Sequence, residues 1–130
     1  YMLSDKLWKF LQEYKGKHES KGNGFGYKLF GPNDTARTMS ARYYKDGADI
    51  LIEQKGWRNP RKLTPGEALQ LMGFTAKYGK LFGMPNGFEQ IVSDAQTYKQ
   101  CGNAVVPQVV EVVAKALLQR IADLGGFRRK

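Results

Sequence analysis

The last third of the chain carries the pattern that most constrains its fold, an apolar repeat with a helical period. The repeat places an apolar side chain at every fourth position: Val109, Val113, Leu117 and Ile121. Pro107 precedes it, and proline is favoured at the first position of a helix because its missing N–H is not needed there. Gly125 and Gly126 end the pattern. The sequence therefore predicts a long C-terminal helix with an apolar stripe on one face.

Upstream, the sequence predicts an N-terminal helix and a small sheet. Four residues recur at helical spacing, and Ser4 or Asp5 can cap the helix that they define: Leu3, Leu7, Leu11 and Tyr14. The glycine-rich residues 16–26 break this pattern. Residues 27–30, 36–44 and 48–53 resemble strands, and Asp46-Gly47 predicts a hairpin turn between the last two.

A second, shorter helix is expected to begin after Thr64. Thr64 and Glu67 have capping-box spacing, and Pro65 lies at the first helical position. Ala68, Leu71 and Met72 would form its apolar face, with Gly73 as its C-terminal stop. Residues 75–92 are rich in glycine and proline and are expected to be mostly irregular. Helices together with a small sheet make an α+β fold.

The composition favours a folded basic protein. The chain has 130 residues, 42% of them hydrophobic, and 21 Lys and Arg against 12 Asp and Glu, a formal net charge of +9. This surplus favours a polyanionic partner, although a soluble domain with a cationic surface has the same composition. A single cysteine and a single histidine exclude an internal disulfide and a Cys/His zinc site, and suit a reducing cytoplasm. No apolar run approaches the length of a membrane span, so no membrane partner is expected.

Two segments stand out beside the helix signals. In residues 98–105, Tyr-Lys-Gln-Cys-Gly-Asn-Ala-Val, a Gly-Asn turn precedes the C-terminal helix and would expose main-chain amides, although such a loop usually only caps a helix. Residues 35–47 combine hydroxyl, basic and aromatic side chains. Between residues 37 and 62 there are seven basic residues and three acidic ones. Arginine can bond guanine at two points, and hydroxyls can hold phosphates, so this chemistry suits DNA; a solvated basic hairpin is the alternative.

If residues 36–44 form a strand, its side chains alternate between two faces. Thr38, Ser40 and Arg42 would then lie on one face, where a DNA groove could meet them, with the small Ala36 beside them. The opposite face would carry Arg37, Met39 and Ala41, and Met39 could enter the core. The glycine-rich residues 22–26 are not expected to bind a nucleotide, because they follow no buried strand and open no helix.

In chain order, these segments resemble the last motifs of DNA (cytosine-5) methyltransferases of the Dcm type. Residues 60–74 match the penultimate motif of that family at every fixed position, with Gly66 and Gln70 where the family often has arginine. Residues 98–105 resemble its final motif, and residues 35–47, together with 21–27, resemble its target-recognition region. The family's nucleophile lies in a Pro-Cys dipeptide. Cys101 follows Gln100 and is therefore expected to be a packed turn residue.

The resemblance implies a fragment of a larger enzyme. The family flips cytosine out of duplex DNA, adds a cysteine to C6, and transfers a methyl group from S-adenosylmethionine to C5. The glycine-rich cofactor strand, the Pro-Cys loop and the Glu-Asn-Val segment are all missing here, so the fragment alone is predicted to be inactive. The implied fold is an α+β fragment, a small twisted sheet with helices, of an α/β S-adenosylmethionine-dependent methyltransferase.

The resemblance also assigns regions and residues. Residues 1–60 would form the target-recognition region, residues 61–92 the penultimate motif and a connector, and residues 93–130 the final motif and a helix that packs on the absent catalytic domain. One wall of the S-adenosylmethionine pocket would come from Gly102, Asn103, Ala104 and Val105. The DNA contacts would be Arg37, Thr38, Ser40, Arg42, Tyr43, Tyr44 and Lys45. The structural residues would be Arg61, Thr64, Glu67 and Gly73. No metal site is expected.

The expected partners are double-stranded DNA and the missing N-terminal catalytic domain of the same chain. The uncovered stripe of the C-terminal helix could also drive self-association of the fragment. The implied location is the bacterial cytoplasm, at the nucleoid. The alternative function is a stand-alone DNA-binding module without catalysis. A basic RNA-binding protein ranks last, because no RNA-recognition motif is present.

Overall fold

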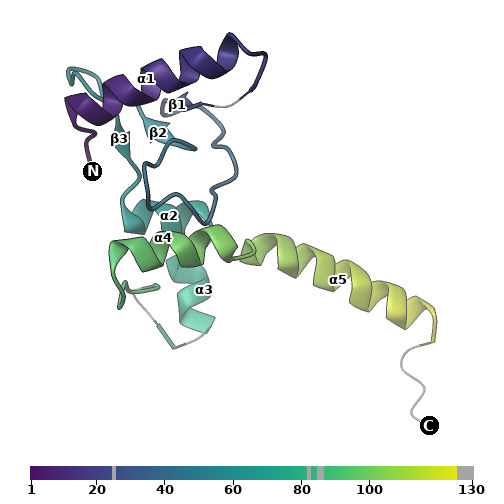
Figure 1. The fold of residues 1–130 in the computed structure, drawn as a ribbon. Coiled ribbons are helices and arrows are strands. Elements are labelled where there is room, and N and C mark those ends of the chain that lie inside the picture. The colour runs from purple at the N-terminus through teal and green to yellow at the C-terminus, as the bar shows by residue number, and fades with distance from the viewer. Residues whose placement is uncertain (25, 82, 85–86, 126–130) are drawn as a thin grey trace.

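The computed structural model describes residues 1–24, 26–81, 83–84 and 87–125. Figure 1 shows helix α1 lying across one end of a small sheet, helices α2 and α4 below the sheet, and helix α5 projecting away from the rest. The elements in chain order are α1 (Asp5–Glu19), β1 (Leu29–Phe30), β2 (Leu51–Ile52), β3 (Arg61–Lys62), α2 (Pro65–Leu71), α3 (Ala76–Leu81), α4 (Asp94–Asn103) and α5 (Pro107–Asp123). Helices with one small mixed sheet confirm the predicted α+β class. The expected basic tail, residues 127–130, lies outside the described residues.

Helix α1 begins where the sequence predicts but extends further. The Ser4 hydroxyl caps it by accepting a hydrogen bond from the Leu7 amide at 3.3 Å. Leu3 and Leu11 are buried in a small cluster with Leu51 of the sheet. The expected break at residue 16 is wrong, because α1 continues to Glu19. Backbone bonds from Ser20 close its last turn, and a single exposed glycine costs a helix only about 1 kcal/mol.

The sheet differs from the predicted hairpin. Strand β1 pairs with β2 in parallel, with Leu29 opposite Leu51, and β2 pairs with β3 in antiparallel. Residues 36–44 form no strand, and the third strand is β3, which the sequence analysis placed in the penultimate motif. A turn does exist at Asp46-Gly47: the Asp46 carboxylate accepts the Ala48 amide at 3.0 Å, and Gly47 has φ +70°. It redirects the chain so that β2 lies beside β1 rather than beside residues 36–44.

The shorter helix α2 has the predicted start and stop, whereas two other helices were missed. Its expected apolar face is only partly right, because Ala68 is buried but Leu71 is 41% exposed. Thr64 and Glu67 form the capping box, and Gly73, at φ +82°, follows the C-cap residue Met72. Residues 75–92 were expected to be irregular but contain α3. The expected Gly-Asn turn at residues 102–103 is instead the last turn of α4, which Ser93 caps. Helices α2 and α4 pack against each other, and Ala68 and Tyr98 of these helices lie in the main core.

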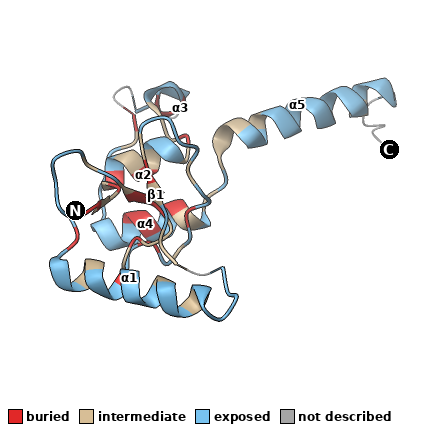
Figure 2. Ribbon diagram, turned by 90° about the horizontal axis from the view of Figure 1, so that it is seen from above, coloured by how far each residue is buried: buried red, intermediate tan, exposed pale blue. Residues whose placement is uncertain are grey.

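Helix α5 is the least covered element of the structure. It begins at Pro107, as predicted, and none of its described residues is buried. Its apolar stripe is open, with Val109 exposed by 57%, Val113 by 61% and Leu117 by 59%. Figure 2 shows the projecting helix almost entirely in the colour of exposed residues. An apolar face of this size normally lies against another surface.

The expectation that no stretch approaches the length of a membrane span was too strict. By length and composition, Asp94–Asp123 is apolar enough to cross a membrane, with a mean hydropathy of 1.4 in its most apolar window. Polar residues interrupt this stretch, so it contains no continuous apolar run of that length. The stretch is also divided between α4 and α5 by residues 104–106, and α5 carries a Glu111–Lys115 ion pair at 2.6 Å. Because the stretch is divided in this way and carries an ion pair, it is only weak evidence for a membrane span.

Candidate functional site

The predicted DNA-reading segment, residues 35–45, runs as an irregular chain between α1 and the α2/α4 pair (Figure 1). Two side chains anchor it in the core: Met39, 3% exposed, and Tyr43, 1% exposed. The other six predicted contacts are all exposed to solvent: Arg37, Thr38, Ser40, Arg42, Tyr44 and Lys45. The burial of Met39 confirms its expected place in the core. Tyr43 was expected to touch DNA, but its side chain is enclosed, so it leaves the set of candidate contacts.

Side-chain hydrogen bonds give this segment its shape in place of a strand ladder. The Ser40 amide donates to the Asp49 carboxylate at 3.2 Å, and the Arg42 amide donates to the Ser40 hydroxyl at 3.3 Å. Serine and aspartate compete in this way for main-chain groups that would otherwise pair in a sheet. Thr38, Ser40 and Arg42 still reach solvent, but from an irregular stretch and the turn that follows it, not from one face of a strand. Asp49 was not among the predicted site residues, although its position shapes the segment.

The final motif touches the reading segment directly. A Cβ atom on Gly102 would overlap the main chain of Ser40 and Ala41, so these two stretches of backbone lie in close contact. Beyond Gly102, Asn103 is exposed and Val105 is 71% exposed. A surface hollow of about 430 Å³ is shared by the reading segment and the final motif, and its lining includes Arg37, Thr38, Gly102, Ala104 and Val105. The structure thus brings together two groups of residues that lie about sixty positions apart in the sequence.

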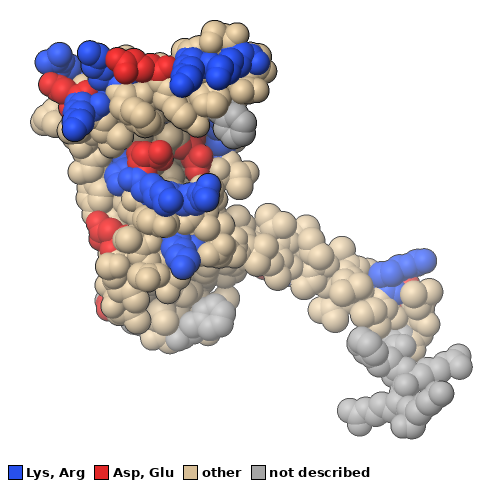
Figure 3. Space-filling model, in the orientation of Figure 1, with Lys and Arg blue, Asp and Glu red and all other residues tan. Residues whose placement is uncertain are grey.

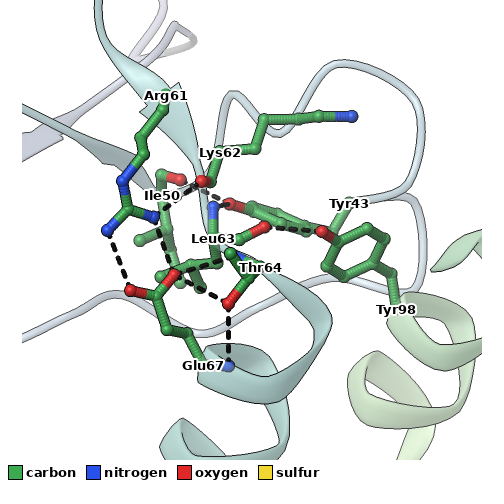
Figure 4. Close-up of polar contacts among 8 residues, drawn as sticks. All are labelled: Tyr43, Ile50, Arg61, Lys62, Leu63, Thr64, Glu67 and Tyr98. Carbon is green, nitrogen blue, oxygen red and sulfur yellow. Dashed lines mark hydrogen bonds and ion pairs between the residues drawn. The ribbon is translucent and has the colours of Figure 1, made fainter. Parts of the chain in front are cut away.

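The four residues predicted to be structural lie at the start and the end of α2. Two hydrogen bonds, at 2.7 and 2.8 Å, join the Arg61 guanidinium to the Glu67 carboxylate (Figure 4). The same carboxylate accepts the Thr64 amide at 2.8 Å, and the Thr64 hydroxyl accepts the Glu67 amide at 3.2 Å. The hydrogen bonds that the carboxylate accepts, first those from Arg61 and then those from Thr64, lower the pKa of Glu67 to about 2. At the other end, the Gln108 amide donates to the Gly73 carbonyl at 3.2 Å, which connects α2 to the start of α5.

Two tyrosines connect the reading segment and the final motif to the backbone of Leu63. The Leu63 amide donates to the Tyr43 hydroxyl at 2.8 Å, and the Tyr98 hydroxyl donates to the Leu63 carbonyl (Figure 4). Their rings also meet edge to face, with centroids 5.2 Å apart. Burial raises the pKa of Tyr43 to about 12 and raises that of Tyr98 as well. Both hydroxyls therefore stay protonated at neutral pH.

Cys101 lies in the same core and does not have the environment of a nucleophile. It is 1% exposed, and burial raises the pKa of its thiol. A protonated, enclosed thiol cannot attack a base, which agrees with its expected role as a packed residue. Within the described part of the chain, no three His, Cys, Asp or Glu side chains gather as a metal site would require.

Comparison with known proteins accounts for the motifs. Residues 1–119 match the family described as C-5 cytosine-specific DNA methylase. The chain is 42% identical over 149 aligned positions to the DNA-cytosine methyltransferase of Escherichia coli (strain K12), covering 100% of this chain and 30% of that protein. It is 46% identical to the type II methyltransferase M.NlaX of Neisseria lactamica, covering 95% of this chain and 37% of that protein. It is 47% identical to the type II methyltransferase M.SsoII of Shigella sonnei, covering 93% of this chain and 29% of that protein.

The chain therefore spans about a third of the length of the curated relatives that it matches. The match covers the reading segment, the capping-box motif and the final motif together, in one continuous alignment. On this basis, the chain belongs to the C-5 cytosine-specific DNA methylase family.

Proposed function

We propose that this chain is the DNA-reading and C-terminal part of a cytosine-5 DNA methyltransferase. The whole enzyme would transfer a methyl group from S-adenosylmethionine to C5 of cytosine in a specific short site of duplex DNA, in the bacterial cytoplasm. The contact between Gly102 and the main chain of Ser40 and Ala41 is the main support, because it places the candidate cofactor wall directly beside the candidate reading segment. Such an enzyme must hold its methyl donor close to the base that it has taken from the duplex.

The DNA contacts would come from the exposed side chains of residues 37–45. Arg42 has a planar guanidinium that can bond guanine in the major groove at two points, and it lies exposed in a turn. Thr38 and Ser40 offer hydroxyls for phosphate oxygens. Asp49 would act indirectly, because its bond to the Ser40 amide sets the position of the turn.

The residues of the final motif fit one wall of a cofactor pocket. Gly102, Ala104 and Val105 line a hollow of about 430 Å³, and the exposed Asn103 provides an amide beside them. This mixture of apolar surface and one polar group suits a nucleoside-containing ligand. S-adenosylmethionine would supply the methyl group, while these residues would only bind and orient it. The attacking cysteine would come from the rest of the enzyme, since Cys101 is buried.

The remaining assignments follow from this placement. Residues 1–60 would form the target-recognition region, residues 61–92 the penultimate motif and a connector, and residues 93–130 the final motif and the helix that covers the catalytic domain. That domain would have the α/β fold of S-adenosylmethionine-dependent methyltransferases. The open stripe of α5 supports this arrangement, because it needs a partner surface.

The test uses the full-length protein with methyl-labelled S-adenosylmethionine and plasmid DNA. We expect label in 5-methylcytosine at one short sequence, and none when the 130-residue segment is used alone. Asn103→Ala in the full-length protein should weaken cofactor binding more than DNA binding. Tight sequence-specific DNA binding without any methyl transfer would instead identify a non-catalytic DNA-binding module. A loss of DNA affinity larger than the loss of cofactor affinity would show that the final motif is wrongly assigned.

A further inference from the structure

A cluster of basic side chains lies beside the C-terminal half of α1, apart from the turn that carries Arg42. Lys15 of α1, Lys28 and Arg37 border the same surface hollow of about 260 Å³. The other described residues that line it are Glu19, Gly24, Gly26 and Tyr27. Three cations and one carboxylate leave this hollow with a net positive charge, which suits an anionic ligand.

Lys15 is held in place by its neighbours before any ligand arrives. Its stem lies against Gly26, where a Cβ atom would come within 2.7 Å of the Lys15 Cγ. Its ammonium lies 4.7 Å from the centre of the Tyr27 ring, and that ring packs edge to face on Trp8 at 4.6 Å. An ordered cation loses less conformational entropy on binding than a free one.

The positive charge of the cluster is only partly neutralised within the chain. Lys15 pairs with Glu19 at 3.8 Å on the helix surface, where such a pair is weak. Lys28 lies over the ring of Phe30, at 5.2 Å from its centre, and a contact with a ring does not neutralise a cation. Arg37 makes no hydrogen bond or ion pair with any residue that the structure describes. Its guanidinium therefore has five donors available for an external anion.

Arg37 also joins this hollow to the candidate reading surface. Arg37 borders a second hollow, which Thr38 and Asp49 also line. It also borders the hollow described above that Gly102 and Val105 line. Figure 3 shows Lys and Arg side chains over α1 and again across the middle of the same face, between α1 and α4. Because Arg37 borders both hollows, a duplex that lies against Thr38 could reach from there towards Lys15 and Lys28.

We propose that Lys15, Lys28 and Arg37 form an anchoring site for the sugar-phosphate backbone of duplex DNA. The inference rests on the proposed function, since it assumes that Thr38 and Arg42 face DNA. We assign phosphate as the ligand, because the charged side chains around the hollow are three cations and one carboxylate, and cations hold phosphate oxygens on any sequence. The site sets how the duplex lies on the protein, and it contributes equally on every sequence.

The test compares two double variants of the full-length protein. Lys15→Gln with Lys28→Gln removes two charges from the cluster, and glutamine keeps the Cβ and Cγ that pack over Gly26. Lys9→Gln with Lys55→Gln is the matched control: Lys9 has the same kind of ion pair on the same helix, with Glu13 at 3.9 Å, and both residues are exposed. Affinity for cognate and scrambled duplexes is measured by fluorescence anisotropy from 50 to 200 mM salt. Thermal melts check that each variant is folded.

For the cluster variant, the slope of log K against log salt should fall by about 1.8 units, or about 0.9 per lost phosphate contact, equally on both duplexes. The control should keep the wild-type slope to within about 0.5 unit. Replacing both residues with arginine should restore the slope. An unchanged slope in the cluster variant, an equal loss in the control, or a loss on the cognate duplex alone would overturn the proposal.

The same proteins are assayed for methyl transfer, because this assay tests the proposed function separately from the anchoring site. The wild type could bind DNA without transferring methyl groups, while the cluster variant shows a lower salt slope. That result would contradict the proposed function and support the anchoring site. If the wild type transfers methyl groups and the cluster variant keeps the wild-type salt slope, the proposed function is supported and the anchoring site is overturned.

Discussion

The Tyr43 hydroxyl accepts a hydrogen bond from the Leu63 amide at 2.8 Å, across twenty residues of sequence. It also donates to the Ile50 carbonyl at 2.7 Å, so a single hydroxyl satisfies two buried main-chain groups. Tyr43→Phe would leave both groups unpaired, and each unpaired group costs about 1–3 kcal/mol. We expect the free energy of unfolding to fall by about 2 kcal/mol, measured by chemical denaturation.

The matched control for this change is Tyr44→Phe. Tyr44 is the next residue in the chain and its side chain is exposed. This variant should keep the stability of the wild type to within about 0.5 kcal/mol. A Tyr43→Phe protein of unchanged stability but reduced DNA affinity would restore Tyr43 as a DNA contact.

Glu67 makes the stability of α2 dependent on pH. Its pKa is lowered from 4.5 to about 2, mainly by the bond from Arg61, so the folded state favours the ionised carboxyl. The stabilisation is therefore complete above pH 4.5 and is lost as pH falls towards 2. Glu67→Gln should cost about 1 kcal/mol at pH 7, and this difference should shrink between pH 5 and 2.5. Urea denaturation of both proteins across that range measures it, and a difference that stays constant with pH would contradict the assignment.

Gly102→Ala should disturb the reading segment from the opposite side of the contact. The added Cβ would overlap the main chain of Ser40 and Ala41, and neither backbone can move without shifting a hydrogen-bonded turn. Overpacking of this kind costs about 1–3 kcal/mol. Gly66→Ala is the control, because no atom lies within 4 Å of its Cβ position and alanine favours the helix. In the full-length protein, discrimination between cognate and scrambled DNA should fall for Gly102→Ala and not for Gly66→Ala. Equal discrimination in both variants would show that the contact of Gly102 with Ser40 and Ala41 does not shape the reading segment.

Arg42→Ala tests whether the exposed turn reads bases. A guanidinium that bonds a base is worth about 1–3 kcal/mol on the cognate site and much less on other DNA. Arg58→Ala removes another exposed arginine, paired with Asp5 at 3.4 Å, and should lower affinity little. Competition binding with cognate and scrambled duplexes at two salt concentrations measures the difference. A uniform loss on all sequences, with a salt slope lower by about one unit, would mean that Arg42 contributes only charge.

The open stripe of α5 should make the isolated 130-residue segment self-associate. Val113 and Leu117 are 61% and 59% exposed, and exposed apolar patches drive association. Val113→Glu with Leu117→Glu should keep the segment monomeric without lowering its melting temperature, because neither side chain is buried. Ala122→Glu places a charge on the opposite side of the helix and should leave association unchanged. Sedimentation velocity at several concentrations gives the masses, and a wild-type segment that stays monomeric throughout would refute the idea.

Elements with strong local signals were predictable from the sequence. Ser4, the Thr64–Glu67 pair and Pro107 begin the helices α1, α2 and α5 as expected, because capping groups act within one turn. Ser93 caps α4 by the same chemistry, so the start of α4 has a local signal in the sequence as well. The glycines of residues 75–92 concealed the short helix α3.

The candidate site was only partly predictable, because its shape depends on distant partners. The Asp46-Gly47 turn exists, but whether it makes a hairpin depends on the residues before it. There the Asp49 carboxylate and the Ser40 hydroxyl accept the Ser40 and Arg42 amides, which a hairpin could have used for its ladder. Alternation along the chain could not show that Tyr43 turns inward, since Ile50 and Leu63 determine its burial. The exposure of Thr38, Ser40 and Arg42 agrees with the expectation, although these residues lie in an irregular stretch and a turn and not in a strand.

The close approach of Gly102 to Ser40 also limits how such enzymes can be re-engineered. A target-recognition segment transplanted from a relative carries its own backbone path, and it must fit around a glycine that leaves no room for adjustment. A chimera joined between residues 60 and 98 would combine one parent's segment with the other parent's final motif. Exchanging both as a matched pair, with residue 102 kept as glycine, is the design that this contact favours.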